Sequence, residues 1–122
     1  VLFDVRETQE FAVSRIKGAT RVDPGIWRST FMRKFGDKLR GKTVVFYCSV
    51  GVRSSKLAAR VQAALKEKGV KAVYNLDGGI FAWHNDARPL VNAQGPTDFV
   101  HPFDKYWGQL VDRRALLSMT PK

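Results

Sequence analysis

One segment constrains the fold more than any other, because residues 43–76 read as strand, short loop, helix and strand in that order. Thr43–Tyr47 is a β-branched and aromatic run without polar alternation, typical of a strand buried on both faces of a parallel sheet. After the loop, apolar residues recur at helical spacing until Gly69, a favoured residue just beyond a helix end. Residues 70–76 are again apolar and of strand length. This order is a βαβ unit with a right-handed crossover, so the sequence predicts an α/β domain.

Length and composition agree with one ordinary globular domain. The chain has 122 residues, 44% of them hydrophobic and 26% charged, which excludes a disordered or low-complexity chain. Its apolar runs are only a few residues long, whereas a membrane-spanning helix needs about 20, so we expect no membrane span. A single cysteine excludes an internal disulfide framework and a multi-cysteine zinc site.

Further elements are predicted on both sides of the βαβ unit. Val1–Val5 and Ala19–Val22 read as short strands, and a helix begins at Ile80 after the turn Asp77-Gly78-Gly79. Trp27, Phe31 and Phe35 recur at every fourth position, which predicts one buried stripe of a helix. We therefore expect these three aromatic side chains to belong to the core.

The C-terminal part has a different character. Residues 92–98 are polar with Gly95 and Pro96, so we interpret them as a linker between a domain at 1–91 and an extension at 92–122. The extension contains an amphipathic helix in this interpretation, and we expect it to pack back onto the domain, with docking to a partner as the alternative. The residues that would share the helix face are Trp107, Leu110, Val111 and Leu117.

The loop after the predicted central strand carries the candidate chemistry. Cys48 lies at the carboxyl end of that strand and just before a helix N-terminus, the edge at which α/β sheets build their sites. A thiolate is favoured by the loop amides, by the free N–H groups at the helix start and by the Arg53 cation. Gly51 allows the tight curl that directs these amides at the sulfur. The alternative is a small buried apolar residue, as free cysteine often is. The combined pattern favours a nucleophile in an anion-binding loop.

Four segments in register resemble the rhodanese family of single-domain sulfurtransferases over about residues 1–90. They are Asp4-Val5-Arg6-Glu7 with Glu10-Phe11, then Ile16-Lys17-Gly18-Ala19, then Cys48-Ser49-Val50-Gly51-Val52-Arg53-Ser54, and finally Leu76-Asp77-Gly78-Gly79-Ile80 with Trp83. The resemblance implies a central, mostly parallel five-stranded sheet flanked by helices on both faces. The family often has His where Arg15 stands, and we expect this difference to affect local packing only.

The resemblance also implies a reaction. Cys48 would take the outer sulfur of thiosulfate or another persulfide donor and pass it to a thiophilic acceptor, without metal or organic cofactor. The substrate-binding residues would be Ser49, Val50, Gly51, Val52 and Arg53. Asp4 and Arg6 would support the loop from beneath, and Gly78 and Gly79 would let backbone approach it closely.

Two other functions remain open at this point. Cysteine phosphatases and arsenate reductases resemble a loop with five residues between Cys and Arg, whereas four lie between Cys48 and Arg53, so a single sulfur atom fits better than a phosphate. A rhodanese-like module without turnover, serving binding or regulation, is the other alternative.

The net positive charge of the chain indicates which kinds of partner it attracts. The net charge is +10, and residues 1–60 carry thirteen basic and five acidic side chains. Such a field attracts anions, although a solvated helix face would look the same. Partners are then a small anionic sulfur donor, a thiol or cyanide acceptor, and a protein thiol. Sulfur delivery to transfer RNA is a third function to weigh, but we do not expect a nucleic-acid partner, because Trp27 and Phe31 are predicted to be buried.

The first residues of the chain are relevant to the cellular compartment in which we expect the protein. The chain begins at Val1, without an initiator Met, which we interpret as a trimmed start. We expect a cytoplasmic protein, with the periplasm as the alternative.

Overall fold

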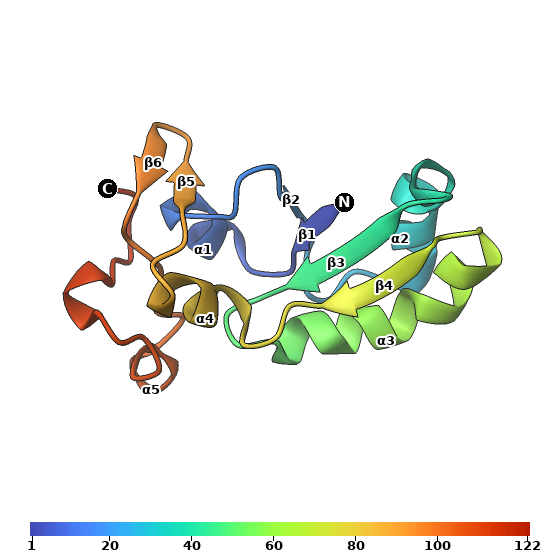
Figure 1. Cartoon of the computed structure of the whole chain (residues 1–122). Coiled ribbons are helices and arrows are strands. Elements are labelled where there is room, and N and C mark those ends of the chain that lie inside the picture. The colour runs from blue at the N-terminus through green and yellow to red at the C-terminus, as the bar shows by residue number, and fades with distance from the viewer.

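The computed structural model describes all residues 1–122 and has a four-stranded parallel sheet at its centre (Figure 1). The strand order is β2-β1-β3-β4. The strands are β1 (Leu2–Asp4), β2 (Thr20–Arg21), β3 (Thr43–Tyr47) and β4 (Ala72–Asn75). The expected fifth strand is not part of this sheet. Instead β5 (Leu90–Asn92) and β6 (Gly95–Thr97) pair with each other as an antiparallel hairpin.

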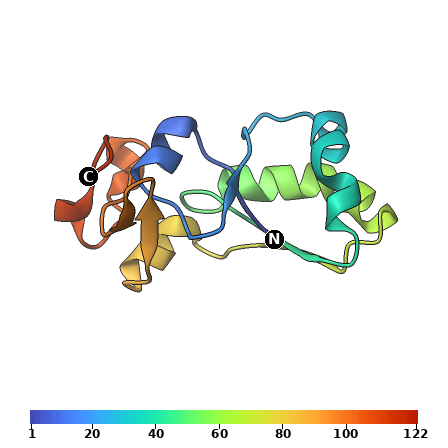
Figure 2. The ribbon, with the colours of Figure 1, turned by 90° about the horizontal axis from the view of Figure 1, so that it is seen from above.

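Two helices cover one face of the sheet, α2 (Arg28–Phe35) and the long α3 (Val52–Glu67), as Figures 1 and 2 show. A 3-10 turn, η1 (Gly36–Leu39), joins α2 to β3. The core on this face combines strand residues with the apolar faces of both helices. Its aromatic centre is Phe3, whose ring lies 5.3 Å from that of Phe31 and 5.4 Å from that of Phe46. These edge-on and stacked contacts fix α2 against β1 and β3.

The opposite face of the sheet is covered, near the carboxyl ends of its strands, by α4 (Gly79–Asn85) and the C-terminal segment. Side chains alternate along β3, so Phe46 faces the helices while Tyr47 belongs to a second cluster. That cluster is built from α4 and the C-terminal segment. Its fully buried apolar members are Tyr47, Ile80, Val100 and Val111. The short helix α1 (Thr8–Val13) lies beside β5 (Figure 1).

The C-terminal segment packs back onto the domain, as expected, but its local structure differs from the prediction. The expected linker at 92–98 contains β6, because Asn92 turns the chain by accepting a hydrogen bond from the amide of Gln94. In place of one amphipathic helix there is a four-residue α5 (Lys105–Gly108) and a 3-10 turn, η2 (Arg114–Leu116). Gly108 packs tightly against Pro102, where an added Cβ would lie 3.0 Å from the proline Cβ.

The predicted aromatic stripe of α2 is only partly correct. Phe31 is fully buried and Phe35 packs against the same core, but Trp27 is 79% exposed. The reason is the helix boundary, because Trp27 is the N-cap residue with extended backbone (φ −67°, ψ 144°), so it does not follow the helical periodicity.

No helix has both the length and the apolar character needed to cross a membrane.

Candidate active site

Cys48 follows β3 directly, and its sulfur is held by two hydrogen-bond donors. The loop curls back so that the amide of Gly51 lies 3.1 Å from Sγ, and the hydroxyl of Ser54 lies 3.3 Å from it. Gly51 has φ +108°, a region that favours glycine, and it caps α3. A side chain here would also press on Asn75, whose Nδ2 would lie 3.3 Å from the new Cβ. The strand end, the glycine and the first helical turn thus position one thiol.

These donors set the ionisation of the thiol. Burial alone would raise the pKa of Cys48, since its surface is 1% exposed. Hydrogen bonds from Ser54 and Gly51, together with the charge of Arg53, outweigh burial and hold the pKa of Cys48 below its ordinary value. The thiolate is the nucleophilic form of cysteine, so the loop favours the reactive species.

Ser54 and Asn75 form a small network around the sulfur that the sequence did not reveal. Ser54 Oγ lies 2.6 Å from Asn75 Oδ1, while Asn75 Nδ2 donates to the carbonyl oxygen of Gly51 at 3.1 Å. A hydroxyl carries one proton, so Ser54 donates either to Asn75 or to the sulfur. Ionisation of Cys48 favours donation to the sulfur. The only sequence signal was a hydroxyl in the first turn after the candidate nucleophile.

The loop rests on α4 at a point of very close backbone approach. The amides of Ile80 and Phe81 donate to the carbonyl oxygens of Cys48 and Ser49, at 2.9 and 3.0 Å. A Cβ on Gly79 would lie 2.5 Å from both of these oxygens, so only glycine fits. Gly78 has φ +74° and caps α4. Gly79 therefore lies directly against the loop that carries Cys48, whereas a Cβ on Gly78 would meet Ala82 of α4 and no atom of that loop.

Arg53 is held by a carboxylate from α1. Its two terminal nitrogens lie 2.8 and 2.9 Å from the two oxygens of Glu10, and it also donates to Ser49 Oγ at 2.8 Å. Ser49 in turn donates to Glu10 at 3.1 Å. Burial would raise the pKa of Glu10, but the bonds from Arg53 keep it below its ordinary value, so the pair is ionised. The resemblance implied that Arg53 binds the substrate, whereas this geometry favours a role in stabilising the loop.

Asp4 and Arg6 form a buried pair beneath the site. Arg6 donates to both carboxylate oxygens of Asp4, at 2.8 and 2.7 Å, and also to the carbonyl oxygen of Ser14. The hydroxyl of Tyr47 donates to the same carboxylate at 2.6 Å and accepts from the amide of Ile16. Both ions are fully buried. Their hydrogen bonds connect β1, β3 and the segment after α1 in one buried polar network.

A cavity of about 140 Å³ opens beside Cys48 and is closed in part by the C-terminal segment. Ser49, Val50, Val52 and Arg53 line it from the loop and α3, and Phe103 and Trp107 line it from the tail. The Arg53 guanidinium lies over the ring of Phe103, 4.6 Å from its centre, a favourable cation–π distance. The sequence did not assign these two aromatics to the site because nothing local connects residues 99–107 with Cys48.

The arrangement offers an activated thiol beside a small, mostly apolar cavity. The loop that would hold an anion on the sulfur is formed, whereas the arginine is neutralised by Glu10. Such a site suits covalent chemistry at one sulfur atom. The residues that the sequence singled out, Cys48 and the loop to Arg53, lie together with Gly79, and Asp4 and Arg6 lie one layer below.

Known proteins with similar sequences and similar structures identify the family of this chain. Two matching relatives are tRNA uridine(34) hydroxylases. The protein from Bacillus pumilus is 35% identical over 88 residues, which cover 70% of this chain and 26% of the relative. The protein from Cytophaga hutchinsonii is 38% identical over 85 residues, which cover 68% and 26%. The chain thus spans about a quarter of the length of these relatives.

Solved structures share the fold. A rhodanese-related protein from Thermoplasma volcanium matches with a TM-score of 0.54 and 25% identity, covering 74% of this chain and 81% of that protein. A probable thiosulfate sulfurtransferase matches with a TM-score of 0.56 and 26% identity, covering 73% and 41%. The model of the rhodanese-like domain family matches residues 1–86, which include the whole Cys48 loop and Gly79. The strand order, the loop and this match together show that the chain belongs to the rhodanese-like domain family.

Proposed function

We propose that this domain is a sulfurtransferase that carries sulfur as a persulfide on Cys48. The observation that carries the proposal is the pair of donors, Gly51 and Ser54, that hold the pKa of the only thiol below its ordinary value beside a small cavity. A persulfide anion needs the same donors as a thiolate. Those donors would stabilise the resting enzyme and the loaded intermediate alike.

The loading step balances in atoms and charge. The Cys48 thiolate attacks the outer sulfur of thiosulfate, a new sulfur–sulfur bond forms, and the sulfur–sulfur bond of thiosulfate breaks. Sulfite leaves with the bonding electron pair, and the enzyme retains a persulfide anion. No proton or external oxidant is required.

The unloading step regenerates the thiolate. A thiophilic acceptor such as cyanide or a thiolate attacks the outer sulfur, and the electron pair of the enzymic sulfur–sulfur bond returns to Cys48. Two half-reactions through one covalent intermediate predict ping-pong kinetics. The apolar wall made by Phe103 and Trp107 would meet the acceptor in this half-reaction.

The decisive experiment is mass spectrometry of the intact protein after thiosulfate treatment. We expect a mass increase of one sulfur atom that cyanide removes with formation of thiocyanate, and no increase in Cys48→Ser. A folded wild-type protein that takes up no sulfur from thiosulfate or from a small persulfide would refute the proposal and favour a binding module. A phosphatase assay on the same sample tests the remaining alternative.

A second candidate function follows from the relatives. Because two proteins that are 35% and 38% identical to this chain are named tRNA uridine(34) hydroxylases, we infer that the Cys48 site serves a reaction on a tRNA uridine. The matched region is only about a quarter of those relatives. The test is nucleoside mass spectrometry of tRNA incubated with the protein or with Cys48→Ser; identical uridine profiles would argue against it.

A further inference from the structure

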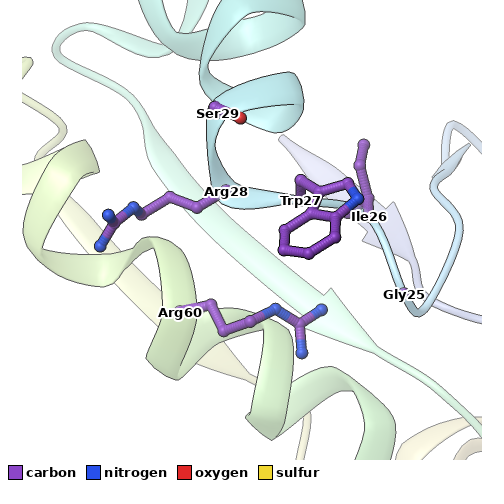
Figure 3. A pocket seen from close by; sticks show the side chains of 6 residues that line it. All are labelled: Gly25, Ile26, Trp27, Arg28, Ser29 and Arg60. Atoms are coloured by element: carbon purple, nitrogen blue, oxygen red, sulfur yellow. The ribbon is translucent and has the colours of Figure 1, made fainter.

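A second hollow lies on the surface between the start of α2 and the middle of α3. Its volume is about 480 Å³, and the residues that line it are Gly25, Ile26, Trp27, Arg28, Ser29 and Arg60. Figure 3 shows the indole of Trp27 and the guanidinium of Arg60 extending toward the same space, whereas the side chain of Arg28, which also lines the hollow, extends away from the indole. None of these residues lines the cavity next to Cys48.

Trp27 is the unusual member of this group. Its side chain is 79% exposed, the largest exposed fraction among the large hydrophobic residues that face solvent. Tryptophan is the largest apolar side chain and is mostly buried in folded domains, so a solvent-facing indole next to two arginines points to a partner. A flat aromatic face is a platform on which a nucleobase can stack.

The arginines are placed to meet an anion beside that platform. Arg60 donates one hydrogen bond to the carbonyl oxygen of Pro24 at 2.7 Å, which fixes its head and leaves its other N–H groups free. Arg28 is exposed and has no acidic partner. The nearest acidic residue in sequence is Asp23, which accepts a hydrogen bond from the amide of Gly25 at 2.7 Å and so stiffens the turn.

The positive charge continues beyond the hollow. Helix α2 has no acidic residue, and in α3 the single acidic residue is Glu67, at the far end. The basic residues of the two helices are Arg28, Arg33, Lys34, Arg53, Lys56, Arg60 and Lys66. Arg60 and Arg53 are seven residues apart, so they lie on the same face of α3 about 10 Å from each other. Arg53 is paired with Glu10, so the unpaired cations along this path are Arg60 and Lys56, and a chain of phosphates bound at the hollow can follow them along α3.

We propose that this hollow binds a nucleotide of single-stranded RNA, with the base stacked on Trp27 and the flanking phosphates contacted by Arg28 and Arg60. The sequence argued against a nucleic-acid partner because Trp27 and Phe31 were predicted to be buried; Phe31 is buried, but Trp27 is exposed and available for stacking. An acidic peptide would satisfy the arginines but would have no use for the indole face. The extended basic surface favours a strand over a free nucleotide.

This inference does not depend on sulfur transfer. It concerns residues that do not touch Cys48, and it would supply the RNA contact that the second candidate function needs. The two ideas can fail separately, since Cys48→Ser removes the sulfur adduct while leaving the hollow unchanged.

The experiment is fluorescence anisotropy of a labelled oligouridylate at several salt concentrations. Trp27→Ala should weaken binding by about five- to a hundredfold, the range expected for the loss of one stacked base, while Trp27→Phe keeps most of the affinity. Arg28→Gln and Arg60→Gln should each weaken binding and lower the slope of log affinity against log salt by about one. Unlabelled uridine monophosphate should compete weakly.

Two matched controls distinguish binding at the hollow from nonspecific attraction of RNA to the positive charge of the whole protein. Arg40→Gln removes one exposed charge outside both helices, and Tyr74→Ala removes an aromatic side chain that is 59% exposed on β4. Both should bind nearly as tightly as wild type. Equal losses in Arg40→Gln and Arg60→Gln, or unchanged affinity of Trp27→Ala, would overturn the proposal. So would polyglutamate that competes as well as RNA and with the same dependence on Trp27.

Discussion

At the scale of single residues, the reactivity of Cys48 depends on a few donors that offset the effect of burial. The buried sulfur would resist ionisation without Gly51 and Ser54, because burial in an apolar surrounding penalises the charged form. Arg53 contributes a smaller part, since its charge is shared with Glu10. The donors nearest the sulfur, not the distant cation, therefore control the thiol.

The first prediction is that Ser54→Ala raises the pKa of Cys48. The variant loses the hydroxyl donor at 3.3 Å from the sulfur. Reaction with thiosulfate or iodoacetamide at pH 7 should slow roughly two- to tenfold, as expected for the loss of one hydrogen bond. The rates of variant and wild type should converge at alkaline pH, where both thiols are ionised. Ser55→Ala is the control, because the Ser55 hydroxyl is exposed and donates only to the carbonyl oxygen of Val52; an equal effect in both variants would contradict the assignment.

The second prediction concerns the close approach at Gly79. In Gly79→Ala, the new Cβ meets two backbone oxygens at 2.5 Å, and backbone cannot move aside as a flexible side chain can. Gly18→Ala is the matched control, because Gly18 also has positive φ (+86°) but has nothing within 4 Å of the added Cβ. Urea denaturation should show the strain of positive φ in both variants and a larger loss of stability in Gly79→Ala, by roughly 1–3 kcal/mol beyond the control. Equal losses would show that the close approach carries no cost.

At the scale of elements, the sequence predicted correctly those strands and helices whose signals are local in the chain. The strand at 43–47 and the helix after it are confirmed because period and boundary signals lie within the elements themselves. Trp27 was assigned wrongly because a boundary shift of one residue moves a side chain from the core to solvent. Glu10 and the tail aromatics were not assigned to the site because their contacts join residues far apart in sequence; the Arg53–Glu10 pair alone spans 43 positions.

The third prediction tests the contribution of the tail to the Cys48 cavity. Trp107→Ala enlarges the cavity on its apolar side, so transfer from the persulfide to an apolar thiol should lose catalytic efficiency by about tenfold or more, as expected for the loss of one apolar contact surface. Transfer to cyanide should change much less, because cyanide is small. Tyr106→Ala is the matched control, since Tyr106 is the adjacent aromatic, is 70% exposed and does not line the cavity. A proportional loss for both acceptors would instead indicate a general effect on the loop.

At the scale of the whole molecule, one buried histidine, His84, joins the C-terminal segment to the domain, and a second, His101, orders the segment itself. His84 Nε2 donates to the carbonyl oxygen of Asp98 at 2.7 Å, and Arg113 donates to the carbonyl oxygen of His84 at 2.6 Å. His101 Nδ1 accepts from the amide of Phe103 at 2.9 Å and so helps to place the ring that lines the cavity. The fold of the tail and the shape of the site are thereby linked through groups that are buried in neutral form.

The last prediction is therefore a loss of stability at mildly acidic pH. Burial lowers the pKa of both His84 and His101 in the folded protein, with Arg113 adding to the effect at His84. A proton on His84 would go to Nδ1, which is buried and has no hydrogen-bond partner. The unfolded chain then binds more protons than the folded one, so the free energy of unfolding is fully present above the ordinary histidine pKa of 6.5 and falls as the pH drops below it. Because the lowered pKa of Cys48 also makes stability fall with pH in this range, the measurement uses Cys48→Ser, and urea denaturation between pH 8 and about pH 5.5 stays above the range in which Glu10, with an ordinary pKa of 4.5, would contribute. Adding His84→Gln should flatten the dependence, because the amide keeps a donor without titrating, and a stability of Cys48→Ser that stays constant across this window would show that neither histidine is held neutral by the fold.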